Sequence, residues 1–259
     1  MFSYSAECMG TIFNFQIEDG LPDAELTRHC EDAMDILRDA DETFSLYKPQ
    51  SEISELNSGI RSWDSASSEQ KKIREDSLSW KDQTAGFFDP ISPAETYDPS
   101  GLVKTWAARN ACHFLEGNGV RQFTLNAGGD IFLSADLESP LLNRVGLSNL
   151  RSIAATGSGS NLVLDLAGTN FRAVATSGAS ERGEHIWRAA ESSSYVQATV
   201  VAKDLVLADI WATALISGGD AAFSEFEKRV DKDTARALVT TRDLAIRSSA
   251  GFAELLATI

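Results

Sequence analysis

The segment Leu207–Asp220, LADIWATALISGGD, combines an apolar helical pattern with one carboxylate, Asp209, and one hydroxyl, Thr213. The pattern predicts a buried helix that ends at Gly218-Gly219. Positions i and i+4 of a helix share a face, so Asp209 and Thr213 can present their oxygen atoms to one point. A buried carboxylate needs a partner. One possibility is a hard cation such as Mg²⁺, which prefers oxygen ligands. The alternative is a structural role in which Asp209 acts as a cap or pairs with an arginine, and Thr213 bonds to a backbone carbonyl.

Two other segments contain groups that suit an anion. The segment Asn126–Asp130, NAGGD, has two glycines that allow either close backbone approach to an anion or a simple hairpin turn. The segment Asp98–Lys104, DPSGLVK, leads into a helix with Lys104 in its first turn, where an ammonium and free N–H groups suit a phosphate. A capped helix with Lys104 in solvent fits the same pattern. The sequence contains neither a GxGxxG fingerprint nor a Walker loop.

The three histidines differ in their surroundings. His29 and His113 lie within helical patterns and are interpreted as structural. His185 lies in a polar segment, SERGEHI, and is a candidate proton-transfer group. The three cysteines are odd in number and lack a close pair, so they predict neither a disulfide framework nor a zinc site.

The spacing of hydrophobic residues predicts the helices and strands that position these candidates. The first half of the chain contains one predicted strand and three predicted helices. TIFNFQI alternates over residues 11–17 and predicts a strand. Apolar residues at spacings of three and four predict an amphipathic helix from Leu26 to Phe44, after a turn in which Asp23 is placed to cap it. Residues 45–57 are predicted as a loop. Further predictions are a polar helix over 67–83, an irregular segment over 84–101 and a helix around 102–115.

The second half contains several short strand-like runs. They lie before NAGGD, around Leu162 to Leu166, from Ala198 to Ala202, and around Val239. Helices and strands do not alternate regularly, and several strands are one hairpin apart. This organisation predicts an α+β fold with mainly antiparallel sheets packed with helices. No linker divides the chain, so residues 1–259 are predicted to form a single domain.

Composition limits the classes of partner. The 259 residues carry 23 basic and 38 acidic side chains, a formal net charge of −15. This excess of acid argues against a general nucleic-acid or anionic-membrane binder, because phosphate neutralisation requires clustered lysine and arginine. The sequence begins MFSYSAECMG, without a signal-peptide pattern, and has no long uninterrupted apolar run. These features predict a cytoplasmic protein without a transmembrane segment.

Eight short segments occur in a particular order between residues 9 and 215. They are MGT (9–11), FSLYKPQSEISELN (44–57), TAGFFDP (84–90), DPSGLVK (98–104), NAGGDI (126–131), ATSG (175–178), HI (185–186) and ADIWATAL (208–215). In this order they resemble the ApbE-type FAD:protein FMN transferases. The resemblance implies an ApbE-like, T-fold-related architecture. It also implies an enzyme that binds FAD with Mg²⁺, cleaves the pyrophosphate, and attaches FMN through a phosphoester to a Thr or Ser of a target flavoprotein.

The resemblance assigns chemical roles to several residues. It implies that Asp209, Thr213 and the backbone carbonyl of Val103 hold Mg²⁺. The implied catalytic residues are His185, Asp209 and Lys104, with His185 carrying the proton of the acceptor hydroxyl. The cation would neutralise charge at the pyrophosphate bond being broken.

The resemblance also implies a binding site for FAD. Tyr47 would pack on the isoalloxazine ring, a large flat apolar surface that suits aromatic stacking. The full set of residues implied to line the site is Met9, Tyr47, Asn57, Asp89, Ser100, Lys104, Gly128, Gly129 and Thr176.

Two departures from the family pattern leave alternative functions open. Trp187 follows the HI dipeptide where the family commonly has an Asp-Pro pair, and Thr105 follows Lys104 where the family usually has Gly. The first motivates hydrolysis of FAD to FMN and AMP. Both together motivate a flavin-binding protein that stores or delivers FAD without catalysis.

Overall fold

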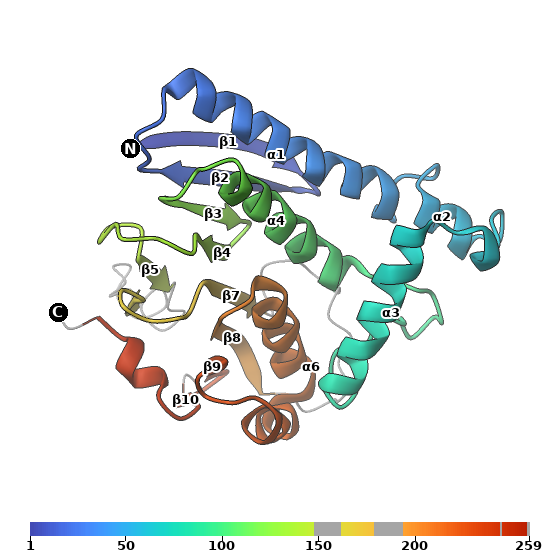
Figure 1. Ribbon diagram of the computed structural model, residues 1–259. Helices are drawn as coiled ribbons and strands as arrows, with labels where there is room; N and C mark the ends of the chain where they lie inside the picture. Colours follow the sequence, from blue (N-terminus) through green and yellow to red (C-terminus); the bar gives the residue numbers. More distant parts are fainter. Residues whose placement is uncertain (148–161, 179–193, 244, 258–259) are drawn as a thin grey trace.

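The computed structural model describes residues 1–147, 162–178, 194–243 and 245–257 (Figure 1). Its centre is an eight-stranded sheet in which each neighbouring pair is antiparallel. In spatial order its strands are β1 (Phe2–Cys8), β2 (Thr11–Ile17), β3 (Phe123–Ala127), β4 (Asp130–Leu133), β7 (Ala173–Gly178), β8 (Tyr195–Ala202), β9 (Ala235–Thr241) and β10 (Ile246–Ser248). A separate antiparallel pair consists of β5 (Arg144–Leu147) and β6 (Leu162–Asp165).

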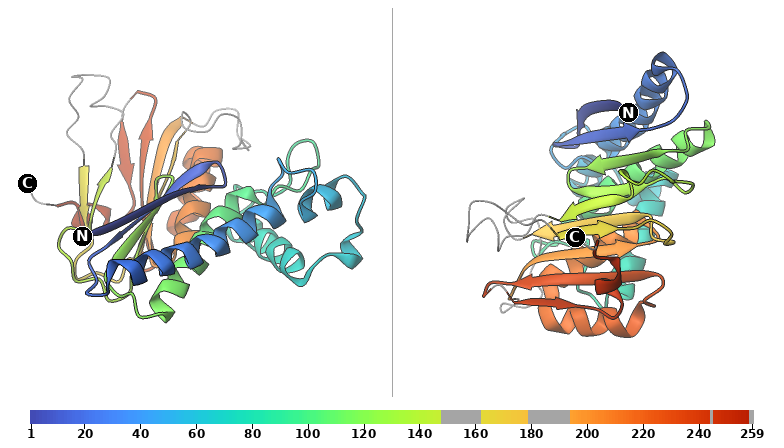
Figure 2. Two further views of the ribbon diagram at one scale, coloured as in Figure 1. Left: turned by 90° about the horizontal axis from the view of Figure 1, so that it is seen from above. Right: turned by 90° about the vertical axis from the view of Figure 1, so that its left-hand side faces the viewer.

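Three long helices cover one face of this sheet, as Figures 1 and 2 show. They are α1 (Asp23–Phe44), α4 (Ser100–Gly117) and α6 (Leu205–Arg229). The left view of Figure 2 shows α2 (Glu52–Asn57) and α3 (Ser68–Gln83) beyond the end of the sheet. Two short 3₁₀ helices are η1 (Trp63–Ser65) and η3 (Phe252–Leu255). The predicted α+β class with a mainly antiparallel sheet is therefore confirmed.

Alternating side chains divide the apolar residues of the sheet between two cores. On β8, Val200 packs with the helices, whereas Val201 packs on the opposite face with β5, β6 and η3. On β2, Phe13, Phe15 and Ile17 are at most 1% exposed and face the helical core, as the alternation predicts. The helical core is the larger of the two, and it fixes the positions of α4 and α6 on the sheet.

Periodicity predicted the long helices well, but some boundaries and one short helix differ. Residues 45–57 are not all loop, because α2 begins after Ser51, whose hydroxyl accepts the backbone N–H of Ser54 at 3.2 Å. Six residues are too few for a helical period to appear in the sequence. Asp23 is not the cap of α1: Pro22 occupies that position without a side-chain hydrogen bond, and Asp23 is the first helical residue.

The helix predicted over LADIWATALISGGD extends beyond its predicted end. Gly219 has φ 58° and ψ −135°, a left-handed conformation that glycine adopts without strain. This residue kinks α6, and the helix continues on the other side as far as Arg229. Among the described residues, α6 is the helix long and apolar enough to cross a membrane, yet 78% of its most apolar window is buried within the protein. It packs on β7, β8 and α4 as a core helix.

The cysteines and the two helical histidines differ in burial, and the interpretation of the two histidines as structural stays a prediction. Cys8, Cys30 and Cys112 are free thiols, and burial raises the pKa of Cys30 to about 12, so its reactive thiolate is scarce. His29 is buried and lies 3.7 Å from Glu25, measured between Nε2 and Oε1. His113 is exposed on α4 and contacts the ring of Phe132 by its edge.

Asp204 fixes the start of α6, and its replacement tests that role. One carboxylate oxygen accepts the Leu207 N–H at 3.0 Å, and the other accepts Nη1 of Arg109, on α4, at 2.8 Å. Asp204→Ala is expected to lower the free energy of unfolding by about 1–2 kcal/mol, measured by urea denaturation, because the cap is lost. Asp204→Asn keeps a capping oxygen and should lose at most about 1 kcal/mol, from the half-exposed ion pair. Equal losses in the two variants would show that the cap contributes nothing.

Candidate active site

Three charged side chains meet between α4, α6 and the start of β4. The ammonium of Lys104 donates a hydrogen bond to Oδ2 of Asp130, and the same nitrogen lies 3.7 Å from Oδ2 of Asp209. The side chains of Asp130 and Asp209 are 2% and 8% exposed, and that of Lys104 is 14% exposed. Buried charges of opposite sign attract far more strongly than they would in water. Asp209 therefore has Lys104 as a partner, where the sequence had left a cation or an arginine as alternatives.

Hydroxyl groups extend this cluster along β7. Oγ of Ser177 lies 3.3 Å from Oγ1 of Thr213, one turn beyond Asp209 on α6. Thr176 contributes its backbone N–H, which donates to Oδ1 of Asp130 at 3.3 Å. The hydroxyl of Thr176 lies 3.0 Å from Oγ1 of Thr199 on β8, on the opposite face of the sheet from α6. The site is thus a group of oxygen atoms with one ammonium among them. We refer to Lys104, Asp130, Thr176, Ser177, Asp209 and Thr213 as the charged cluster.

Two ion pairs, one within the cluster and one outside it, join α4 to α6. Arg109 pairs with Asp204 at the start of α6, while Lys104 lies near Asp209, further into α6. The residue that comes later in α4 pairs with the residue that comes earlier in α6. The two helices are therefore antiparallel. Lys104 lies one turn further into α4 than predicted, because the helix begins at Ser100.

The NAGGD segment forms a two-residue hairpin turn, one of the two structures considered for it. Gly128 and Gly129 both have positive φ, 65° and 101°, and Ala127 pairs with Asp130 across the turn. The Gly129 N–H donates to the side chain of Asn126 at 2.8 Å, and the Gly128 N–H donates to the Ile12 carbonyl at 3.2 Å. Both N–H groups have protein acceptors in this structure, and the turn precedes Asp130 directly. Contact of Gly128 or Gly129 with FAD stays a prediction.

Several predicted flavin-site residues lie outside the charged cluster. Tyr47 is 82% exposed in the segment after α1, and Met9 lies in the β1–β2 turn with φ 49°. The Ser100 hydroxyl donates to Asp98 at 2.5 Å, at the start of α4. Val103, whose carbonyl was assigned to the metal, lies on α4 next to Lys104 and is 4% exposed. His185 lies outside the described residues.

Asn57 and Asp89 hold the segment that leads into α4. The Asn57 amide donates to the carbonyl of Tyr97 at 2.8 Å. Asp89 lies 2.7 Å from Nζ of Lys81 and accepts the Ile91 N–H at 2.9 Å. These contacts support the irregular segment before α4 and therefore act on the position of Lys104. Contact of Asn57 or Asp89 with a flavin stays a prediction.

Sequence reasoning overlooked two members of the cluster. Asp130 ends the NAGGD segment and Ser177 is the third residue of ATSG, so both stood inside motifs already singled out. The sequence signal for Asp130 was its place directly after the Gly128-Gly129 turn. The signal for Ser177 was its place next to Thr176, a predicted site residue. Only the tertiary structure shows that Asp130 contacts Lys104 of α4 and that Ser177 contacts Thr213 of α6.

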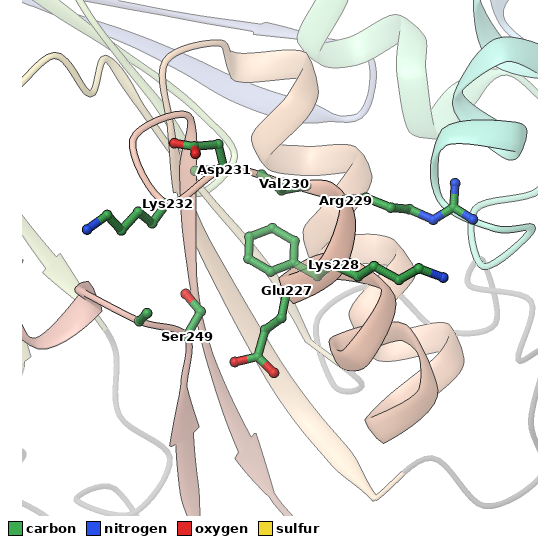
Figure 3. A pocket seen from close by; sticks show the side chains of 10 residues that line it. Glu227, Lys228, Arg229, Val230, Asp231, Lys232 and Ser249 are labelled. Atoms are coloured by element: carbon green, nitrogen blue, oxygen red, sulfur yellow. The ribbon is translucent and has the colours of Figure 1, made fainter.

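A pocket of about 560 Å³ lies at the opposite end of α6 from Asp209. Figure 3 shows that Lys228 and Arg229 point to one side of it and Lys232 to the other, so these charges do not converge. Lys228 and Arg229 both pair with Glu225. The residues that line it are Phe226, Glu227, Lys228, Arg229, Val230, Asp231, Lys232, Ala235, Ser249 and Ala250. The charged cluster is therefore the better candidate for chemistry.

Comparison with known families decides the relationship of this chain to other proteins. The model of the ApbE family matches residues 9–96 and 92–238, which is most of the sequence. The chain belongs to the ApbE family. No curated protein matches it significantly.

Solved structures of ApbE proteins share the fold along almost their whole length. The flavin transferase ApbE from Vibrio cholerae has a TM-score of 0.77 at 17% identity, covering 98% of this chain and 99% of that one. An ApbE protein from Thermotoga maritima has a TM-score of 0.74 at 15% identity, covering 99% of each chain. The Pseudomonas stutzeri flavinyl transferase ApbE, in its apo form, has a TM-score of 0.73 at 15% identity, covering 99% of this chain and 97% of that one.

The charged cluster lies entirely within the part of the chain that defines membership of the ApbE family. All six of its residues fall in the second matched range, 92–238. The β10 strand and η3 follow this range, and Phe252 and Leu255 of η3 pack in the second core, on the opposite face of the sheet from the helices. The candidate active site that the geometry indicates therefore lies within the family-matched part of the chain, at the start of β4 and the end of β7.

Proposed function

We propose that this ApbE-family protein is a Mg²⁺-dependent FAD:protein FMN transferase. The observation that carries the proposal is the convergence of Lys104, Asp130 and Asp209 beside the hydroxyls of Thr213 and Ser177. The similar protein from Vibrio cholerae is a flavin transferase, and the one from Pseudomonas stutzeri is a flavinyl transferase. The same order of motifs in this chain supports the same reaction class.

The donor atoms of the cluster suit a hard divalent cation. Asp209 offers a carboxylate, Thr213 a hydroxyl and Val103 a backbone carbonyl, all of them oxygen ligands. Among the residues that the structure describes, no three His, Cys, Asp or Glu side chains form a metal-binding group. A site with few protein carboxylates that is completed by water and phosphate oxygens is typical of Mg²⁺. When bound, the cation would neutralise negative charge on the pyrophosphate of FAD.

The protein's own side chains would bind and orient the two reactants. Lys104 would place a positive charge beside the phosphates in a partly buried environment, where electrostatic stabilisation is strong. Tyr47, exposed after α1, is available to stack on the isoalloxazine ring. The hydroxyl oxygen of the acceptor Thr or Ser would bond to the FMN phosphorus as the pyrophosphate P–O bond breaks and AMP leaves. We propose His185 as the base that takes the hydroxyl proton.

A fluorescence assay tests this function. The protein is incubated with FAD, MgCl₂ and an acceptor flavoprotein domain, and a denaturing gel is inspected for a fluorescent protein band while AMP is measured by chromatography. We expect a band and an equal amount of AMP, both abolished by EDTA. The control is the acceptor with its Thr replaced by Val, which should give no band.

The two alternative functions give different results in the same assay. AMP release without a band, at a rate independent of the acceptor, would contradict transfer and indicate FAD hydrolysis. FAD that binds and stays intact in saturating Mg²⁺ would contradict both reactions and indicate a storage protein.

A further inference from the structure

The ammonium of Lys104 is shared unequally between two buried carboxylates. It donates a hydrogen bond to Asp130, whereas its distance to Oδ2 of Asp209 is 3.7 Å. That separation is an ion pair and is longer than a hydrogen bond. In this arrangement Lys104 is held mainly by Asp130, and its contact with Asp209 is the weaker of the two.

Asp130 is well fixed in the position from which it holds Lys104. Its side chain is 2% exposed, and its other oxygen, Oδ1, accepts the backbone N–H of Thr176 on β7 at 3.3 Å. The residue follows directly after the Gly128-Gly129 turn, where β4 begins between β3 and β7. A carboxylate fixed by a strand and by a neighbouring backbone amide is a stationary anchor for a flexible lysine.

We propose that Asp130 is a positioning residue that holds Lys104 aside, so that Asp209 is available to bind a divalent cation. The proposal rests on the proposed function, because it gives Asp209 the role of a metal ligand. An ammonium and a cation compete for the same carboxylate oxygen. Among the described residues, Asp209 is the other carboxylate within 4 Å of the Lys104 ammonium. Without Asp130, the ammonium would move toward Asp209 and occupy the position that the cation needs.

The charges of the cluster are consistent with this role. The formal charges of Asp130, Asp209 and Lys104 sum to one negative charge, and a negative site attracts a cation. If Asp130 were neutral, Asp209 and Lys104 would form an ion pair with no net charge. In a buried site of low effective dielectric this difference is large enough to control cation binding.

A set of four proteins tests the proposal by calorimetric titration with Mg²⁺ alone, without FAD. Asp130→Asn is expected to weaken Mg²⁺ binding about 10- to 100-fold, the effect typical of losing a residue that orients a metal ligand. Lys104→Met should bind Mg²⁺ at least as tightly as the unmodified protein. The double variant, Asp130→Asn with Lys104→Met, should recover most of the lost affinity because the competing ammonium is gone.

The interaction between the two substitutions distinguishes positioning from other roles. If Asp130→Asn weakens Mg²⁺ binding equally with and without Lys104, Asp130 acts directly on the cation or on the fold, and the proposal is wrong. Unchanged affinity in Asp130→Asn would also overturn it. If the unmodified protein does not bind Mg²⁺ in the absence of FAD, the proposal about Asp130 is overturned, because it requires a cation on Asp209. The metal dependence of flavin transfer is tested separately, by the effect of EDTA in the transfer assay.

A matched control tests whether the loss of any partly buried ion pair on α4, and not only the Lys104–Asp130 pair, weakens Mg²⁺ binding. Glu116 lies on the same helix as Lys104, and its carboxylate pairs with Arg172 in a partly buried position. Glu116→Gln should therefore leave the Mg²⁺ affinity unchanged. Thermal unfolding followed by circular dichroism shows that each variant is folded before it is titrated. Equal weakening in Glu116→Gln and Asp130→Asn would contradict a specific role for Asp130.

Discussion

Replacing Asp209 with asparagine is expected to lower the rate of flavin transfer at least about 1000-fold while the protein remains folded. A factor of this size corresponds to about 4 kcal/mol of transition-state stabilisation, within what a bound metal ion supplies. Asparagine keeps the shape of the side chain but lacks the charge that binds the cation and pairs with Lys104. Because Lys104 retains Asp130 as a partner, the substitution does not leave an isolated buried ammonium.

Two measurements check this prediction. The rate is taken from the fluorescent acceptor band in a single-turnover assay, and the free energy of unfolding is measured in urea. The matched control is Asp220→Asn, which lies on the same helix and pairs with Tyr195 and Arg247 outside the cluster. It should change the rate less than about twofold. A full rate per folded molecule in Asp209→Asn, accompanied by a large loss of stability, would show that Asp209 is structural.

Replacing Gly218 with alanine is expected to destabilise the protein by about 1–3 kcal/mol, the usual cost of overpacking a buried site. A Cβ atom at this position would lie 2.2 Å from Cδ1 of Phe87 and within 2.7 Å of two further ring atoms. Gly218 itself does not have a positive φ, so the backbone accepts alanine and the clash alone causes the loss. Phe87 would have to move, and with it the segment that carries Asp89.

A double-mutant cycle isolates the contact between Gly218 and Phe87. In a Phe87→Ala background, Gly218→Ala should no longer destabilise, and the coupling between the two changes should be about 1–3 kcal/mol. Gly117→Ala is the matched control, because Gly117 is also helical and has nothing within 4 Å of its added Cβ. It should be neutral or stabilising by up to about 1 kcal/mol. Equal effects of Gly218→Ala in both backgrounds would show that Phe87 is not the cause.

The sequence predicted the longest helices and β2 from repeated spacings, but the strand β1 was missed although Phe2, Tyr4, Ala6 and Cys8 alternate with more exposed residues. The alternation in TIFNFQI and the three-and-four spacing from Leu26 to Phe44 correspond to β2 and α1 in the structure. The prediction also failed where the pattern was too short or was interrupted. The helix α2 has six residues, and the glycine pair in α6 predicted an end where the structure has a kink at Gly219.

The sequence by itself determined which atoms lie on a common face within one element. Asp209 and Thr213 share a face of α6 because helical geometry is local, and the two glycines before Asp130 form a turn for an equally local reason. Only the tertiary structure decided that Lys104, on another helix, is the partner of Asp209, and that Asp130 and Ser177 complete the cluster. Such contacts join segments far apart in the chain. They depend on strand order and on how α4 packs against α6, which no local spacing specifies.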